Sequence, residues 1–267
     1  EVLQQPHLCE IEHVRHVYDS IAQTWNATRY QPWPRVAEFI RRQPRGALFA
    51  DVGCGNGKNR DVCAERGFVV GSDFSLGLLQ ICQQKQHEVC AADALRLPFR
   101  TESVDVVLSI AVIHHISTED RRAQLIAEML RILRPGGQAL IYAWALEQGK
   151  GRSGHAFAAQ DVWVPWHVRQ GEPASILRQS PSSHGVMDRD KRAVVFQRYC
   201  HVHREGELPL LLQRALARHP HIRVKMVEHY TDHGNWAMCV EKEPHFPGAA
   251  RQDGPAPGSE SESPGDR

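Results

Sequence analysis

The 267-residue sequence lacks long apolar runs: no uninterrupted stretch approaches the roughly 18 residues that a membrane-spanning helix needs. It also lacks the basic and then apolar leader of a secreted protein. We therefore expect a soluble protein with no membrane partner, in the cytoplasm, with the nucleus as a second compartment. The hydrophobic content of 42% is still enough to fill the core of one large α/β domain.

Cysteine and histidine are present, but the sequence does not arrange them as ligand sets. The 7 cysteines include no C-x-x-C pair, which argues against a disulfide framework and fits a reducing compartment. Cys9, His13 and His16 share one face of a possible helix, but a structural zinc site needs a fourth ligand, so a solvated face is the better interpretation. The pairs His201-x-His203 and His219-x-His221 also lack partners. We therefore predict no metal site.

The sequence has little net charge, and the value of +1 alone does not indicate nucleic-acid binding. Arginines on possible helix faces could contact phosphates, although for each one a solvated face is the ordinary alternative. These arginines are Arg41, Arg42, Arg45, Arg121, Arg122, Arg131 and Arg134.

The most informative feature that is present is a glycine-rich segment at 51–57, Asp-Val-Gly-Cys-Gly-Asn-Gly, directly after the apolar run 47–50. A strand followed by such a turn lets the backbone approach a nucleoside cofactor. Dinucleotide sites favour G-x-G-x-x-G, whereas G-x-G-x-G suits a cofactor without phosphate. S-adenosylmethionine fits this site, with loop amides at its aminoacyl end and Asp51 facing its ammonium group. We predict Asp51, Gly53 and Gly55 as cofactor-binding residues.

Two more acids follow predicted strands. Asp73 ends the strand 68–73, 22 positions after Asp51, where a carboxylate can accept hydrogen bonds from both ribose hydroxyls. Asp93, followed by Ala94, ends the next strand and could reach the adenine amine. Each acid could instead be an ordinary turn residue. The regular spacing of all three favours one cofactor crevice.

The order of predicted elements indicates an α/β fold with a doubly wound, mostly parallel sheet and an antiparallel final strand. Strands are expected at 47–52, 68–73, 88–92, 104–110, 138–145, 222–230 and 236–241, and helices at 58–66, 75–86, 119–133 and 205–218. Ile11, Val14, Tyr18, Ile21 and Trp25 recur at helical spacing and should pack on the sheet.

The domain organisation follows from the same pattern. We predict an N-terminal extension at 1–9, a class I methyltransferase domain at 10–243 and a disordered tail at 244–267, which is rich in Pro, Gly, Ser and Glu. Residues 147–194 have no clear period and are interpreted as a loop insertion over the cofactor crevice.

Several segments together resemble one family. They are Thr28-Arg29-Tyr30-x-Pro32-Trp33-Pro34, the loop 51–58, Asp93-Ala94-Leu95 with Pro98, Ser109 to His115 (S-I-A-V-I-H-H), Arg134-Pro135-Gly136-Gly137 with Ile141-Tyr142-x-Trp144-Ala145, Gln160 to His167 (Q-D-V-x-V-P-W-H), Arg198-Tyr199-x-His201-Val202 with Glu205 to Leu208 (E-G-E-L), and Gly234-Asn235-Trp236. The chain resembles the tRNA wobble-uridine carboxymethyl methyltransferases, whose animal version is the C-terminal domain of an AlkB-homologue protein. The glycine loop and R-P-G-G are generic to class I methyltransferases, and the other segments are more specific.

The resemblance implies S-adenosylmethionine-dependent methyl transfer to the carboxylate of 5-carboxymethyluridine at the tRNA wobble position, forming 5-methoxycarbonylmethyluridine. It also implies two partners: tRNA and a small zinc-binding activator subunit. A carboxylate with a pKa of about 4 is already anionic at neutral pH, so placement of the substrate matters more than a base.

Candidate substrate residues come from the family segments. We expect His115 and Arg29 to be catalytic, the histidine orienting the carboxylate or the uracil edge and the arginine donating charge-assisted hydrogen bonds. Arg29, Tyr30, Trp33, His114 and Trp166 are the expected substrate-binding residues, with stacking of the flipped base on the aromatic rings. Core packing is the alternative for His115, Tyr30 and Trp33.

The sequence departs from the family pattern at Asn59, Phe74, Cys200 and His203, which bears on substrate detail and turnover. Two other functions remain open at this point. One is a class I methyltransferase acting on a small molecule. The other is a non-catalytic RNA-binding scaffold of the same fold.

Overall fold

A seven-stranded sheet forms the centre of the computed structural model, which describes residues 5–148, 156–169 and 185–244. The strand order is β3-β2-β1-β4-β5-β10-β9. The strands are β1 (Ala47–Val52), β2 (Gly67–Asp73), β3 (Val89–Ala91), β4 (Val104–Ile110), β5 (Leu133–Trp144), β9 (Val224–Asp232) and β10 (Asn235–Lys242). β1 to β5 pair in parallel, and β10 pairs antiparallel with both β5 and β9. The predicted mostly parallel sheet with an antiparallel final strand is confirmed.

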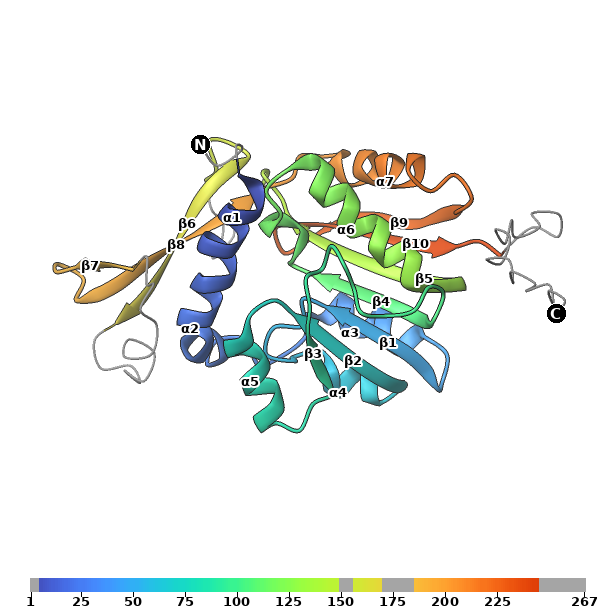
Figure 1. Ribbon diagram of the computed structural model, residues 1–267, viewed down its shortest axis with the longest axis horizontal. Coiled ribbons are helices and arrows are strands. Elements are labelled where there is room, and N and C mark those ends of the chain that lie inside the picture. The colour runs from blue at the N-terminus through green and yellow to red at the C-terminus, as the bar shows by residue number, and fades with distance from the viewer. Residues whose placement is uncertain (1–4, 149–155, 170–184, 245–267) are drawn as a thin grey trace, which may run out of the picture.

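Helices cover both faces of this sheet (Figure 1). They are α3 (Pro34–Arg42), α4 (Arg60–Ala64), α5 (Leu76–Gln84), α6 (Glu119–Ile132) and α7 (Glu207–Ala217). Successive residues of a strand point to opposite faces, so Phe49 of β1 packs with Phe39 of α3, while Ala50 packs with Leu125 of α6. Two apolar cores therefore sandwich the sheet, and the doubly wound prediction is confirmed. Within the described ranges, no helix combines the length and apolar composition needed to cross a bilayer.

The end of α6 differs from the prediction of a helix reaching 133 and a strand starting at 138. The helix ends at Ile132, and Leu133 already pairs with Val104 of β4. The R-P-G-G segment therefore lies within β5, next to a shift in strand register, with Gly136 at φ +80°.

The N-terminal helical segment does not pack on the main sheet as predicted. It runs through α1 (Pro6–Glu10), a π-helical turn (Ile11–Arg15) and α2 (His16–Asn26). Val17 and Ile21 pack against a second sheet, and Ala22 packs on α5. The helix begins inside the predicted extension 1–9, where Cys9 is buried.

The second sheet lies in the segment predicted to be a loop insertion at 147–194. It contains β6 (Asp161–Arg169), β7 (Val186–Asp188) and β8 (Ala193–His201), in the antiparallel order β6-β8-β7. Figure 1 shows it beside α2, on the far side of that helix from the main sheet. Alternating apolar positions such as Val164 and Val168 were the signal that the loop prediction missed: both are buried, and Val168 packs with Val17 and Ile21 of α2. The rest of the predicted insertion at 149–155 and 170–184, and the predicted tail from 245, lie outside the described residues.

Candidate active site

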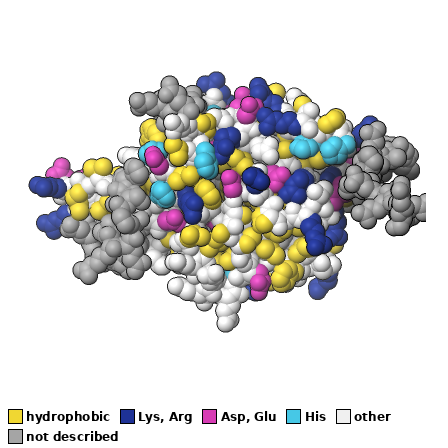
Figure 2. Space-filling view, viewed as in Figure 1, with side chains coloured by type: hydrophobic (Ala, Val, Ile, Leu, Met, Phe, Trp, Pro, Cys, Tyr) yellow, Lys and Arg dark blue, Asp and Glu magenta, His cyan; other side chains and the backbone are white. Residues whose placement is uncertain are grey.

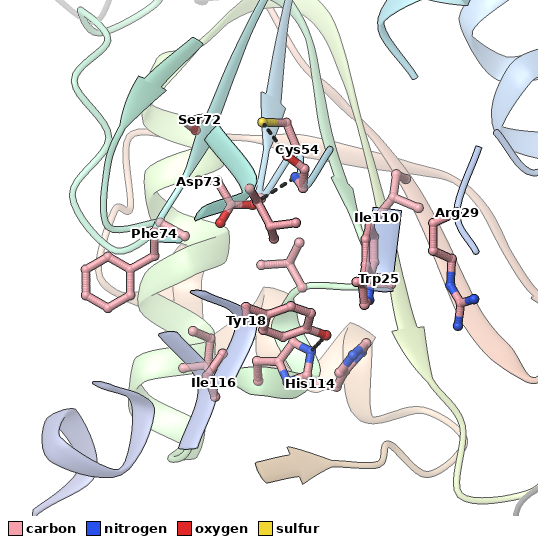
Figure 3. A pocket seen from close by; sticks show the side chains of 18 of the residues that line it. Tyr18, Trp25, Arg29, Cys54, Ser72, Asp73, Phe74, Ile110, His114 and Ile116 are labelled. Atoms are coloured by element: carbon pink, nitrogen blue, oxygen red, sulfur yellow. Dashed lines mark hydrogen bonds between the residues drawn. The ribbon is translucent and has the colours of Figure 1, made fainter. Parts of the chain in front are cut away.

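A pocket opens at the carboxyl ends of β1, β2 and β4, where the strand order reverses direction. Ligands of open α/β sheets bind at such a switch point. One wall consists of the glycine loop, Asp73 and Asp93, and the opposite wall of Tyr18, His115 and Arg198. Figure 3 shows Asp73 reaching the pocket from the end of β2 and Tyr18 from α2.

The glycine loop has a backbone that only glycine adopts easily. Gly53 has φ +71° and Gly55 has φ +58°. A Cβ on Gly53 would lie 2.3 Å from Val112 Cγ2, so both the backbone conformation and the close contact require glycine. The Gly53 amide donates to the Ser72 carbonyl at 2.7 Å, which ties the loop to β2. Gly53 and Gly55 both line the pocket, as predicted.

Asp73 connects the loop to the pocket. Its carboxylate accepts from the amides of Gly55 and Ser75, each at 2.8 Å. Burial raises the pKa of Asp73, while these amide donors oppose that rise. The carboxylate is therefore held in place and lines the cavity, which fits the predicted ribose acceptor.

Asp51 lies beneath the loop rather than in the pocket, contrary to a direct contact with the cofactor ammonium group. It is 2% exposed, and its Oδ2 accepts from Asn59 Nδ2 at 3.3 Å. Its Oδ1 has no partner in the structure, and burial raises the pKa of Asp51 to about 6. Lys58 and Asn59, which directly follow the glycine loop, line the cavity, and Asp51 does not. Asn59, one of the positions at which the sequence departs from the family pattern, therefore donates a hydrogen bond to Asp51.

Asp93 and Ala94 line the same wall as Asp73, as predicted. Asp93 Oδ1 also accepts from the Leu95 amide at 2.9 Å, which is an ordinary turn bond. The turn role and the pocket role are therefore compatible, because the second carboxylate oxygen is not used in that bond.

His115 is not the free hydrogen-bond donor that the sequence suggested. Its Nδ1 donates to the Tyr199 carbonyl at 2.9 Å, so its Nε2 accepts from the Tyr18 hydroxyl, also at 2.9 Å. Burial lowers the pKa of His115 to about 3, which keeps the ring neutral. Both ring nitrogens are engaged, and His115 holds the Tyr18 hydroxyl in place. It is a positioning residue in this arrangement.

His114 lies beside it and lines the pocket. Its ring stacks on Trp144 at a centroid distance of 4.9 Å, and its Nδ1 accepts from the Trp144 amide at 3.3 Å. This tautomer places the proton on Nε2. Burial, with the neighbouring His115 adding to it, lowers the pKa of His114 well below its ordinary value.

Arg198 and Tyr18 are pocket residues that the sequence analysis did not select. Arg198 of β8 is 6% exposed, and its Nη1 donates to the Tyr18 hydroxyl at 3.2 Å. Its Nε has no partner, and no carboxylate forms an ion pair with it among the described residues. The Arg-Tyr-x-His segment of the family pattern was the available signal for Arg198, whereas Tyr18 was assigned to the apolar stripe of a helix. A buried guanidinium without an acidic partner favours an anionic ligand.

The other predicted substrate residues divide into two groups. Arg29 and Trp33 line the pocket, and Lys58 Nζ lies 4.5 Å from the centre of the Trp33 ring. Tyr30 is 77% exposed and lies outside the pocket lining. Trp166 is also outside the lining: its indole donates to Thr24 Oγ1 at 3.1 Å, and its ring packs against the guanidinium groups of Arg29 and Arg198. Trp166 therefore supports the pocket arginines.

Two further expectations are corrected. His201 does have partners, since its ring nitrogens lie 2.8 Å from Asp161 Oδ1 and 2.7 Å from Glu207 Oε1. The arginines considered for phosphate contacts are mostly paired with acids within the protein. These ion pairs are Arg41 with Glu65, Arg42 with Glu228, Arg121 with Glu10, Arg122 with Glu207, Arg131 with Glu128, and Arg134 with Asp105.

Comparison with known proteins agrees with this geometry. Residues 50–141 match the methyltransferase domain family. A tRNA (carboxymethyluridine(34)-5-O)-methyltransferase of Schizosaccharomyces pombe is 39% identical over 235 residues, which cover 87% of this chain and 97% of the relative. The relative of the same name from Xenopus tropicalis is 36% identical over 275 residues, 87% of this chain and 41% of its own length. The chain thus spans about two fifths of the length of that vertebrate relative.

A solved S-adenosylmethionine-dependent methyltransferase from Clostridium acetobutylicum superimposes with a TM-score of 0.58 at 11% identity, covering 86% of this chain and 97% of the other. At that identity the likeness concerns the fold alone. The near-complete coverage of the Schizosaccharomyces pombe relative carries the assignment, and the chain belongs to the tRNA (carboxymethyluridine(34)-5-O)-methyltransferase family, with the class I methyltransferase fold.

Proposed function

We propose that the chain transfers a methyl group from S-adenosylmethionine to the carboxylate of 5-carboxymethyluridine at the wobble position of tRNA, forming 5-methoxycarbonylmethyluridine. The observation that carries this proposal is Arg198, a buried guanidinium that lines the pocket and has no ion-pair partner among the described residues. A substrate that brings its own carboxylate supplies the missing anion. Many class I methyltransferase substrates are neutral and would leave this charge unpaired.

The residues of the first wall fit the cofactor. Gly53 and Gly55 let the backbone come close to a ligand, Asp73 presents a carboxylate suited to ribose hydroxyls, and Asp93 with Ala94 lies where a nucleobase edge would end. Bound S-adenosylmethionine supplies an electrophilic methyl group on a cationic sulfur. The acidic side chains of this wall suit that positive charge.

The residues of the second wall fit the nucleophile. A carboxylate is anionic at neutral pH, so no proton needs to be removed before it attacks the methyl carbon. The Arg198 guanidinium, which donates through Nη1 to the Tyr18 hydroxyl and is oriented by it, can hold one carboxylate oxygen and leave the other for attack. His115 fixes the Tyr18 hydroxyl through its neutral ring. Arg29 at the pocket rim adds a second positive charge. Placement of this kind can account for several kcal/mol of rate acceleration, on the order of 7–11 kcal/mol at most.

The RNA partner would approach the rim beside Arg29, where exposed Tyr30 offers a stacking surface. Figure 2 shows Lys and Arg side chains spread across one face of the molecule rather than gathered in a single patch. We therefore expect modest affinity for bulk RNA and recognition that depends on the modified base.

We further propose that a small zinc-binding activator subunit binds the open edge of the main sheet. Within the described residues, β3 is an edge strand that pairs with residues 71–73 of β2, and no strand pairs with the same edge of β2 before residue 71. Phe68 in this part of β2 is 56% exposed. An open edge with an apolar side chain suits β-strand addition. Phe68→Asp should prevent copurification of the subunit, whereas Leu210→Asp, at a similarly exposed position on α7, should not.

The reaction is tested by nucleoside analysis of tRNA. The chain, with the activator subunit, is incubated with S-adenosylmethionine and tRNA carrying 5-carboxymethyluridine, and the ester nucleoside is quantified. Ester formation supports the proposal. Cofactor binding without any ester, or methylation of small acids in the absence of RNA, would contradict it in favour of a small-molecule enzyme. Absence of cofactor binding would favour the non-catalytic scaffold.

A further inference from the structure

A second group of polar side chains lies beyond the pocket, where β8 leads into α7. It consists of His201, His203 and Glu207, whose ligand atoms all lie within 4.8 Å of one another. The two histidines are buried, and the glutamate is partly buried. The T-shaped rings of His201 and His203 are 5.0 Å apart.

His203 is the first sign that this group binds a ligand. Its side chain is 0% exposed, and among the described residues neither ring nitrogen has a hydrogen bond of normal geometry, the backbone of Trp144 making at most a weak one. A buried imidazole without partners is unfavourable, because its polar atoms lose water and gain nothing in return. Packing alone would be satisfied by any aromatic ring of this size and does not require a histidine.

His201 is the second sign. Its Nδ1 lies 2.8 Å from Asp161 Oδ1, and its Nε2 lies 2.7 Å from Glu207 Oε1. A neutral imidazole carries one proton, so it cannot donate to both carboxylates. At 2.7 Å the gap between Nε2 and Glu207 Oε1 holds a proton, and a metal ion can replace that proton once the two atoms move apart. Carboxylate, histidine and metal in this order are the usual arrangement around a bound ion.

The remaining groups around Glu207 are consistent with a ligand role. Its Oε2 accepts from Gln160 Nε2 at 2.7 Å and from the Arg204 amide at 3.1 Å, which leaves Oε1 directed at His201. Arg122 lies 3.9 Å from the same Oε1 and is held by the carbonyls of Ile116 and Ser117. The carboxylates of Asp161 and Glu207 outnumber this one guanidinium.

A neighbouring group, His114, His115 and Cys200, has similar spacing but is less suited to a metal. Both ring nitrogens of His115 are engaged by the neutral oxygens of Tyr18 and Tyr199, whereas those of His201 face carboxylates, of which Glu207 can itself bind a metal ion. Burial raises the pKa of the Cys200 thiol to about 12, which opposes formation of a thiolate ligand.

We propose that His201, His203 and Glu207 bind a divalent transition metal ion, with Zn²⁺ as the expected ion because two imidazoles and one carboxylate suit it. Tetrahedral coordination at about 2.0–2.2 Å puts ligand atoms about 3.4 Å apart, which a small rotation of the rings can reach. Asp161, whose side chain is 55% exposed, supports His201 and gives the ion access from solvent. The bound ion would join β8, which carries Arg198, to α7.

The test uses the whole chain freed of metal by a chelator and then titrated with Co²⁺, whose visible absorption reports tetrahedral coordination by protein ligands. We expect one equivalent to bind, and Zn²⁺ to displace it. His203→Phe, which restores an aromatic ring of similar shape, should weaken binding at least tenfold. The matched control is His221→Phe. His219 and His221 form a similar T-shaped pair, 5.8 Å apart, and no carboxylate of the described residues forms an ion pair or a hydrogen bond with either ring.

The thermal midpoint provides a readout that does not depend on spectroscopy. Added Zn²⁺ should raise the midpoint of wild type and of His221→Phe, but not that of His203→Phe. No saturable Co²⁺ signal in wild type, or equal affinity in wild type and His203→Phe, would overturn the proposal. Because methyl transfer is not measured, the outcome is independent of the proposed reaction.

Discussion

The two walls of the pocket are built in different ways. The wall formed by the glycine loop, Asp73 and Asp93 follows adjacent parallel strands, and its hydrogen bonds join residues close in sequence, such as Gly55 and Asp73, 18 positions apart. The wall formed by Tyr18, His115 and Arg198 joins residues 97 and 180 positions apart. The first wall is already ordered without a ligand, because two backbone amides hold the Asp73 carboxylate, which keeps further lone pairs for the ribose. The second contains an unpaired guanidinium and is completed by an anion.

This difference indicates that the two walls have different functions. The wall of the glycine loop, Asp73 and Asp93 presents the cofactor-binding elements that many class I methyltransferases share, whereas the wall with Tyr18 of α2 and Arg198 of β8 determines which nucleophile fits. Variants in the two walls should therefore separate cofactor affinity from turnover.

The largest effect is expected from Arg198→Gln. Loss of a charged hydrogen-bond donor to the substrate carboxylate should lower kcat/KM by about 1.5–3 kcal/mol, roughly 10- to 150-fold. Cofactor affinity measured by calorimetry should stay near wild type. Arg198→Lys keeps the charge without the planar fork and should recover part of the loss. An equal fall in cofactor affinity would show that the two walls are not separable.

Asp73→Ala is expected to have the converse effect. It removes the acceptor of two amide donors and of the ribose, so cofactor affinity should weaken by about 1–3 kcal/mol. Turnover at saturating cofactor should change less. Unchanged affinity in a calorimetric titration would refute the ribose assignment.

His115 in the second wall and Asp51 beneath the first wall should also give pH dependences of opposite sign. Burial lowers the pKa of His115 to about 3, so its contribution to the free energy of unfolding is present above pH 6.5 and is lost as the pH falls toward 3. Burial raises the pKa of Asp51 to about 6, so its contribution is present at low pH and is lost as the pH rises through 6.

Between the pKa values of each group in the folded and unfolded states, the free energy of unfolding changes by about 1.4 kcal/mol per pH unit. Urea unfolding of wild type, His115→Asn and Asp51→Asn at pH 5 and pH 7.5 measures both slopes. Relative to wild type, His115→Asn should lose less stability on acidification, and Asp51→Asn should lose less as the pH rises. Parallel slopes in all three proteins would contradict the comparison.

The smallest effect is expected from Tyr18→Phe, which removes the hydroxyl between His115 and Arg198 but keeps the ring. The loss should be about 1 kcal/mol in kcat/KM, the usual value of one neutral hydrogen bond. His115→Ala should likewise reduce turnover while cofactor affinity remains near wild type. If His115 acts through Tyr18, the double variant should lose less than the sum of the single losses.

Most of the main sheet could be predicted because its strands are short apolar runs separated by turn residues. The small sheet was missed, since the alternation in β6 lies within a segment rich in turn formers, and Trp163 and Pro165, on the exposed face of the strand, interrupt the apparent pattern. His115 was located correctly in the pocket, but its hydrogen-bond partners Tyr18 and the Tyr199 carbonyl come from other elements, so its role could not be read from neighbouring residues. The family motif also predicted Trp166 as a pocket residue, but its indole donates to Thr24 of α2 instead. This contact, too, joins elements that are distant in the sequence.

The sequence by itself determined the parallel sheet, the glycine loop and the strand-end carboxylates, because period, glycine conformation and strand ends are local properties of the chain. Only the tertiary structure decided that Arg198 faces the pocket without an acid, that Asp51 lies beneath the loop, and that His201 meets Asp161 and Glu207. The physical reason is that charge pairing and burial depend on which distant segments meet.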